Sequence, residues 1–118
     1  MNPDTPWPPQ VDEPLPRAAE AYAEPQKLAW LLSDHGHGRE WARVLHVDEN
    51  DTLLFWHALL QSAIGASIYK VNNREPHGIG CAIETTITVG QRTTGARIAW
   101  HYKHAHDTPR LVTAYPIG

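Results

Sequence analysis

Late in the chain, the sequence changes to a two-residue alternation of apolar and polar residues that few folds can accommodate. In 81-CAIETTITV-89, mostly apolar residues alternate with small or polar ones, and 96-ARIAWHYK-103 repeats this pattern. The intervening GQRTTG carries a glycine at each end, which is typical of a turn. A strand with one apolar face must cover that face with other elements. The pattern therefore predicts an antiparallel hairpin with one buried face and one open face.

The two glycines suggest a register for this hairpin. If Gly90 lies opposite Gly95, apolar side chains meet apolar ones, and Glu84 meets His101 on the open face. A one-residue slip would set apolar side chains against polar ones, so the alternation itself favours this pairing.

Two further strands are predicted, at 67–71 and at 110–116. The facing of the last strand is ambiguous from its sequence, RLVTAYP. If Val112 and Ala114 continue the apolar face, the three residues between and beside them join the open face. Those residues are Leu111, Thr113 and Tyr115.

Three helices are predicted before the sheet. The first follows Pro25, and its Leu28, Leu31 and Leu32 share one side. The second lies within 35–47, with Trp41, Val44 and Leu45 at helical spacing, and the third runs from residue 52 to Gly65. The apolar stripe of the third helix is expected at Leu53, Trp56, Leu60 and Ile64. The predicted fold class is α+β, with two to three helices on one face of a three- to four-stranded antiparallel sheet.

Charge divides the chain into an acidic first part and a mildly basic second part. Residues 1–51 hold ten acidic and four basic residues, whereas residues 52–118 hold six basic and three acidic ones. Seven of the ten prolines precede residue 26, so residues 1–24 are predicted to form an acidic, mobile extension of a single domain at 25–118. The basic body is compatible with an anionic ligand.

The sequence shows neither a signal peptide nor a membrane-spanning run, so we expect a cytoplasmic protein. The N-terminus lacks the basic start and apolar centre of a signal peptide, and no apolar run reaches membrane-spanning length, so no membrane partner is expected. A single cysteine, Cys81, excludes an internal disulfide. Delivery by a secretion system would leave no mark in this sequence.

The open face of the predicted sheet carries a candidate catalytic group. His101 stands there beside Glu84, and an imidazole can remove the proton of an RNA 2′-hydroxyl near neutral pH. Cations nearby would stabilise the charged phosphorane. Glu84 could orient the imidazole or share the proton transfers. The alternative is that Glu84 and His101 form a solvated pair with no chemical role.

His77 is a second histidine candidate. It lies in REPHGIG, a glycine-flanked loop before the hairpin, where a substrate could approach the backbone closely. The same residues are also ordinary turn chemistry.

A metal site is the competing chemical hypothesis. His101, His104 and His106, joined by Asp107 and the histidines at 35 and 37, could ligate a transition metal. However, H-x-x-H-x-H matches no standard ligand spacing, so no metal and no other cofactor are predicted.

The sequence carries three further motifs: an H-x-x-G turn at residues 35–38, a tryptophan strand at Trp100 and the closing motif PRLVTAYP at residues 109–116. Through these motifs, the chain from about Lys27 to its end resembles a family of small bacterial domains found in toxin settings. Its helix-then-sheet layout is similar to that of the barnase, EndoU, colicin and RelE group of ribonucleases. The acidic leader lies outside the resemblance.

The resemblance draws attention to Arg110, Thr113 and Tyr115 in the closing motif and to His35 at the turn. Together with the pattern, it predicts a metal-independent endoribonuclease acting on RNA, with tRNA as one possible substrate, and a cognate antitoxin or immunity protein. The predicted catalytic residues are His101, His77, Glu84, Arg110, Thr113 and Tyr115. The predicted substrate-binding residues are Arg97, Lys103 and His35. The alternative is a binding or immunity-type protein that engages a protein or nucleic acid through the open sheet face without catalysis.

Overall fold

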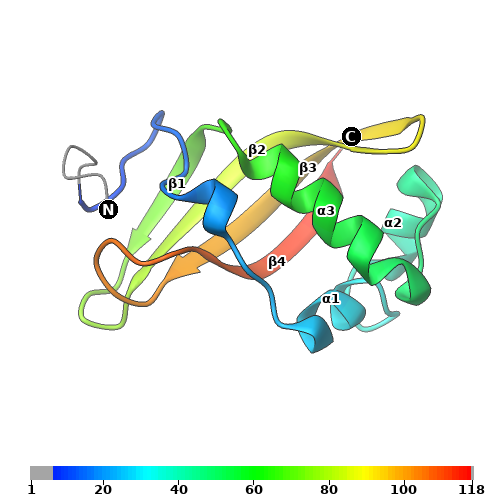
Figure 1. Ribbon diagram of the computed structural model, residues 1–118, viewed down its shortest axis with the longest axis horizontal. Helices are drawn as coiled ribbons and strands as arrows, with labels where there is room; N and C mark the ends of the chain where they lie inside the picture. The colour runs from blue at the N-terminus through cyan, green and yellow to red at the C-terminus, as the bar shows by residue number, and fades with distance from the viewer. Residues whose placement is uncertain (1–6, 118) are drawn as a thin grey trace.

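The computed structural model describes residues 7–117 as helices followed by a single sheet. The α-helices are α1 (Pro25–Leu31), α2 (Gly38–Leu45) and α3 (Thr52–Ala63), and short 3₁₀ turns lie at Ala18–Glu20 and Glu49–Asp51. The strands are β1 (Ile68–Asn73), β2 (Ile79–Val89), β3 (Arg92–Tyr102) and β4 (Arg110–Ile117). They form one antiparallel sheet in the order β1-β2-β3-β4, with the helices on one side (Figure 1). The predicted α+β class is confirmed.

The hairpin of β2 and β3 forms as predicted, but its register differs. Val89 pairs with Arg92, so Gly90 and Gln91 alone make the turn, and Gly90 has a φ of +60° that favours glycine. The predicted pairing of Glu84 with His101 is therefore wrong. Glu84 lies opposite Arg97 instead. Because the shift involves an even number of residues, each side chain keeps its predicted face.

A bulge in β4 resolves the facing of the last strand. The pairing with β3 shifts between Ala99, which lies opposite Thr113, and Trp100, which lies opposite Leu111. Val112 is the extra residue and is 37% exposed, whereas Leu111 is buried. Of the arrangements that the sequence left open, the one with Val112 toward the core and Leu111 on the open side is therefore not the one formed. Ala114 is buried as expected, and Thr113 and Tyr115 stay on the open side.

Helix α3 buries a different stripe from the predicted one. Phe55, Ala58, Leu59 and Ala63 are buried, whereas Leu53 is 82% exposed. The first turn, 53-LLFW-56, is apolar on every side, so helical spacing alone does not identify the buried side. Contacts with β2 select it instead, and the Thr85 hydroxyl donates a hydrogen bond to the Ser62 carbonyl at 2.8 Å.

The described part of the acidic leader packs against the sheet. The Asp12 N–H donates to the Ile68 carbonyl at 2.8 Å, beside the start of β1, and Tyr22 forms a bridge with Arg110 at the start of β4. Leu15 is buried in the core between these points. The domain boundary predicted at residue 25 is therefore not a structural boundary. Residues 1–6 of the predicted mobile extension lie outside the described residues.

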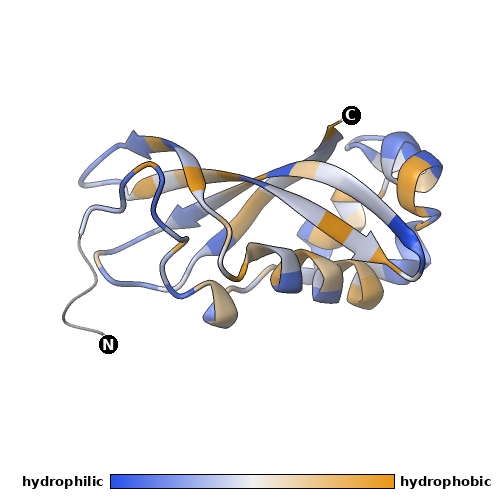
Figure 2. Ribbon diagram, turned by 90° about the horizontal axis from the view of Figure 1, so that it is seen from above, coloured by the Kyte–Doolittle hydropathy of each residue, from blue (hydrophilic) through white to orange (hydrophobic). Residues whose placement is uncertain are grey.

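The core lies between the helices and one face of the sheet. Figure 2 shows the sheet as one layer and α3 as another. Trp41, Phe55, Ile83 and Trp100 are among the fully buried side chains there. Among residues 7–117, no helix lies over the middle of the other face of the sheet (Figures 1 and 2), and His37 at the start of α2 contacts Tyr115 at its edge. In the same range, no helix is long and apolar enough to cross a membrane.

Candidate functional site

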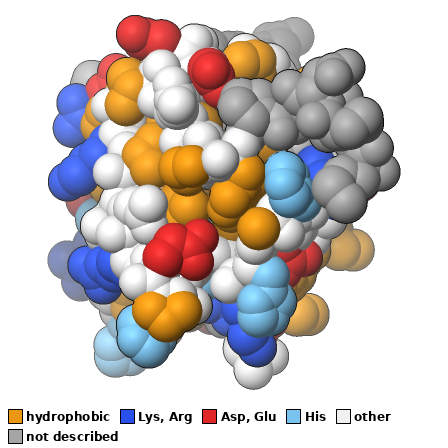
Figure 3. Space-filling model, turned by 90° about the vertical axis from the view of Figure 1, so that its left-hand side faces the viewer, with side chains coloured by type: hydrophobic (Ala, Val, Ile, Leu, Met, Phe, Trp, Pro, Cys, Tyr) orange, Lys and Arg blue, Asp and Glu red, His pale blue; other side chains and the backbone are white. Residues whose placement is uncertain are grey.

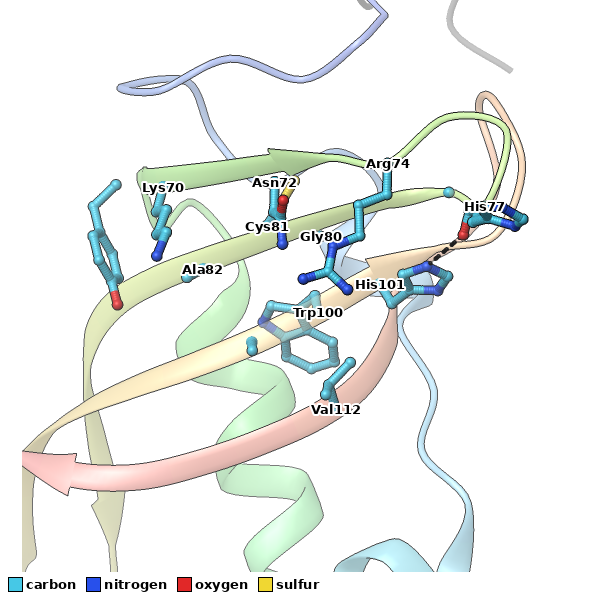
Figure 4. Close-up of a pocket in the computed structure, with 13 residues that line it drawn as sticks. Lys70, Asn72, Arg74, His77, Gly80, Cys81, Ala82, Trp100, His101 and Val112 are labelled. Atoms are coloured by element: carbon cyan, nitrogen blue, oxygen red, sulfur yellow. Dashed lines mark hydrogen bonds between the residues drawn. The ribbon is translucent and has the colours of Figure 1, made fainter.

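The open face of the sheet contains a groove of about 460 Å³. Cross-strand pairing explains why it is hollow. Ala82 of β2 lies opposite Ala99 of β3, and Gly80 lies opposite His101, so the centre of this face has little side-chain volume. Larger side chains stand on β1, where Lys70 and Asn72 pair with Ala82 and Gly80 (Figure 4). Small residues on two central strands thus form the floor, and residues from β1 form one wall.

The groove has a basic wall. Lys70 and Arg74 line it, and the Arg74 side chain reaches across β2 toward His101 (Figure 4). The Asn72 amide, oriented with its oxygen toward Arg74, accepts from Nε at 3.0 Å and from Nη2 at 3.2 Å. Within residues 7–117, no carboxylate lines the groove, and neither cation forms an ion pair. The groove is therefore suited to an anion, although the protein as a whole is acidic.

His101 is held at the end of the groove by the β1–β2 loop. Its Nε2 lies 3.2 Å from the His77 carbonyl oxygen. Because a carbonyl only accepts hydrogen bonds, this contact requires a proton on Nε2 and leaves Nδ1 as the basic nitrogen of the neutral ring. Gly78 makes the approach possible, since its φ is +101° and a Cβ there would lie 2.6 Å from Nε2.

The structure brings the backbone of His77 to the site, but not its imidazole. In Figure 4 the ring points away from the groove while the carbonyl faces His101. The loop is tight, because the His77 N–H donates to the Arg74 carbonyl at 2.7 Å and the Arg74 N–H donates to the Gly78 carbonyl at 3.0 Å. His101 and His77, both predicted to be catalytic, therefore do not present two imidazoles to the groove in this arrangement.

Glu84 and Arg97 form a separate cluster beside the groove. Arg97 Nε donates to Glu84 Oε1 at 2.6 Å, and its guanidinium lies over the Tyr69 ring, 5.5 Å from the centroid. The hydrogen bond with Glu84 raises the pKa of Arg97, and burial followed by the nearby Tyr115 raises the pKa of Tyr69. Glu84 therefore does not orient His101, and Arg97 is already paired.

Tyr115 joins the edge of this cluster from β4. Its ring centroid lies 5.5 Å from that of the His37 ring. His37 Nδ1 also lies 3.2 Å from Glu40 Oε1. His37 was considered only as a metal ligand from the sequence, whereas the structure places it against the closing motif. Thr113 lies opposite Ala99, in the row beside the groove.

Three other predicted site residues do not line the groove. Lys103 is exposed beyond the end of β3, and His35 is exposed in the turn before α2, where its N–H donates to the Ser33 hydroxyl. Arg110 lines a different cavity, of about 240 Å³, with Glu24 and Lys27. Arg110 lies directly opposite His101 in the pairing of β3 with β4, but neither it nor Lys103 nor His35 lines the groove.

Cys81 lies behind the groove floor and is 2% exposed. Burial raises the pKa of its thiol to about 11, so the thiol is protonated near neutral pH and is not a candidate nucleophile.

The histidine-rich end of the molecule does not assemble metal ligands. Figure 3 views this end and shows histidine side chains spread around an apolar centre. Within residues 7–117, no three His, Cys, Asp or Glu residues are grouped to hold an ion. His106 instead lies against the Trp7 ring, with ring centroids 5.4 Å apart.

Sequence reasoning missed the wall of the groove, which comes from Tyr69, Lys70, Asn72 and Arg74. The predicted first strand ended at residue 71, because the two asparagines that follow are typical of loops. The spacing along the strand could have identified this wall. If Tyr69 is treated as a bulge, Lys70 and Asn72 face the side opposite to the apolar residues at 68 and 71.

Comparison with known proteins gives a family but no characterised relative. No curated protein and no solved structure matches the chain. The sequence model of DUF6883, a domain of unknown function, matches residues 14–118, which include every strand, all three α-helices and the groove. The chain therefore belongs to the DUF6883 family.

Proposed function

We propose that the groove on the open sheet face binds RNA and that the protein is a metal-independent endoribonuclease with His101 as its base. The observation that carries this proposal is the combination of one imidazole with Lys70 and Arg74 around a hollow that has no carboxylate lining within the described residues. Cations without acidic partners favour a phosphate backbone, and an imidazole beside them supplies a base.

The proposed reaction needs few groups. His101 Nδ1 takes the proton of a 2′-hydroxyl, and the oxygen attacks the adjacent phosphorus. Lys70 and Arg74 stabilise the charge of the phosphorane. The bond to the 5′ oxygen breaks, and that oxygen takes a proton from the imidazolium or from water. The products are a 2′,3′-cyclic phosphate and a 5′-hydroxyl.

RNA binding without cleavage is the second candidate. The observation that favours it is the His77 ring, which points away from the groove and leaves only one imidazole there (Figure 4). In either case, a cognate inhibitor of the kind expected from the toxin resemblance would act by covering this face.

Incubation of RNA and tRNA with the protein in EDTA tests the proposal. The variants are His101→Gln, which keeps a donor for the His77 carbonyl, and His104→Gln, which changes an exposed histidine outside the groove. We expect His101→Gln to lose at least about 100-fold in cleavage rate. His104→Gln and His77→Gln should keep the activity, and the fragments should end in cyclic phosphate.

Uncut RNA that still binds would overturn the nuclease and support the second candidate. Binding should then weaken with salt, and Lys70→Ala or Arg74→Ala should reduce the slope of log affinity against log salt by about 1. Lys103→Ala is the matched control, because Lys103 is an exposed cation outside the groove. Absence of both binding and cleavage would overturn RNA as the ligand.

A further inference from the structure

We infer that the groove takes single-stranded RNA, with one base stacked on Tyr69 and the adjoining phosphates between Lys70 and Arg74. This inference rests on the proposed function and specifies the form of its substrate. It assigns a specificity-determining role to Tyr69, which neither the sequence analysis nor the family match identified.

Tyr69 reaches the open face because of a strand irregularity. The pairing of β1 with β2 shifts between Ile68, which faces the core, and Lys70, which lies opposite Ala82. Tyr69 is the extra residue at this bulge, and bulges commonly redirect a side chain. Tyr69 is 39% exposed as a residue and lines the groove. An exposed aromatic ring at the end of a basic groove provides a surface for a nucleobase.

The Tyr69 ring is supported from outside the groove. The Arg97 guanidinium lies over it, 5.5 Å from its centroid, and Glu84 holds that guanidinium through a 2.6 Å hydrogen bond. A cation over an aromatic face stabilises the ring's position. Tyr69 is therefore a supported stacking surface rather than a loose surface tyrosine.

The order of groups along β1 matches a nucleotide chain. Tyr69 lines the groove and directly precedes Lys70 on β1. Lys70 and Arg74 stand apart along the groove, with Arg74 near His101 (Figure 4). With a base stacked on Tyr69, the adjoining RNA backbone would run past Lys70 toward His101.

A single strand suits this groove better than a duplex. Duplex RNA is recognised by shape across about 16 base pairs, whereas unstacked bases are read by aromatic side chains. A groove of about 460 Å³ with one aromatic end offers the second kind of contact. Attack by a 2′-hydroxyl also requires a backbone that can leave helical geometry.

Binding of 2′-fluoro oligonucleotides tests the inference without cleavage, because they lack the attacking hydroxyl. The probes are one labelled single strand, the same strand annealed to its complement, and the strand with its bases replaced by abasic sites. We expect the single strand to bind at least about tenfold more tightly than the duplex or the abasic strand. Tyr69→Ala should lose about tenfold for the normal strand and little for the abasic strand.

Two substitutions separate stacking from structure. Tyr69→Phe should keep the affinity, and Tyr22→Ala is the matched control, because Tyr22 is an exposed tyrosine that does not line the groove. Equal affinity for single strand and duplex, or equal affinity for normal and abasic strands, would overturn the inference while leaving an RNA-binding groove in place. If no probe binds, both this inference and the proposed function fail.

Discussion

The covered and open faces of the β2–β3 hairpin come from alternate residues of the same two strands, yet they differ in side-chain size and burial. On the covered face, Ile83 and Trp100 are fully buried against the helices. On the open face, their neighbours Ala82 and His101 border a hollow. Large side chains on one face hold the domain together, whereas small side chains on the other leave room for a ligand.

The largest expected effect comes from substituting, one at a time, two neighbouring residues of β3 that lie on opposite faces of the sheet. Trp100→Ala should lower the free energy of unfolding by about 3–5 kcal/mol, because it removes a fully buried indole. His101→Gln should change it by less than about 1 kcal/mol while abolishing cleavage. Urea unfolding and the cleavage assay measure the two effects. Similar losses of stability in both variants would contradict the division between the faces.

A second prediction uses the buried thiol of Cys81. Burial raises its pKa from 9.0 to about 11, so above pH 9 the unfolded state loses this proton while the folded state keeps it. Stability should therefore fall by about 2 kcal/mol as the pH rises from 9 to 11. Burial also raises the pKa of Tyr102, which adds to the decline.

The control for this pH effect is Cys81→Ala, which should show a shallower decline in the free energy of unfolding across the same range. Urea unfolding at pH 8, 9, 10 and 11 gives both slopes. Identical slopes for the two proteins would show that the thiol ionises equally in the folded and unfolded states.

A third prediction fills the open face. Ala99→Leu adds volume at the groove floor, where it should weaken RNA binding by about tenfold or more through steric exclusion. It should leave the urea midpoint nearly unchanged, because Ala99 lies on the face without helices. Thr86→Leu is the control, since Thr86 is exposed on the same face outside the groove. Normal binding by Ala99→Leu would place the ligand elsewhere.

The smallest expected effect concerns the ion pair of Glu84 and Arg97. Both side chains are more than 40% exposed, so Glu84→Gln should cost less than about 1 kcal/mol of stability despite the 2.6 Å contact. A double-mutant cycle with Arg97→Gln isolates the pair. Strong coupling between the two substitutions would indicate that this cluster is structural rather than a support for Tyr69.

Alternation predicted the faces of the sheet well because it is a local property. The facing of Ile83 and His101 follows from period two and is unchanged by an even shift in register. The register itself depends on which residues make the turn, and GQRTTG offers two glycines for that role. The structure uses Gly90, which has a positive φ in the two-residue turn, whereas Gly95 lies within β3.

The site was predicted less completely, because it depends on non-local pairing. His101 was identified, but its contact with the His77 carbonyl depends on the backbone of a distant loop. The wall formed by Lys70 and Arg74 depends on a bulge in β1, and the facing of Val112 depends on a bulge in β4. Bulges have no reliable sequence signature, so alternation misplaces the residues next to them.

The proposed function requires that the open face of the sheet, and not the helical side, binds RNA. Titration of the ¹⁵N-labelled protein with a short 2′-fluoro single strand, followed by amide chemical shifts, tests it most directly. We predict the largest shifts at Lys70, Asn72, Gly80, Ala82, Ala99 and His101, with small changes in α1–α3. Shifts centred on the helices, or none at saturating oligonucleotide, would contradict the assignment of the groove as an RNA site.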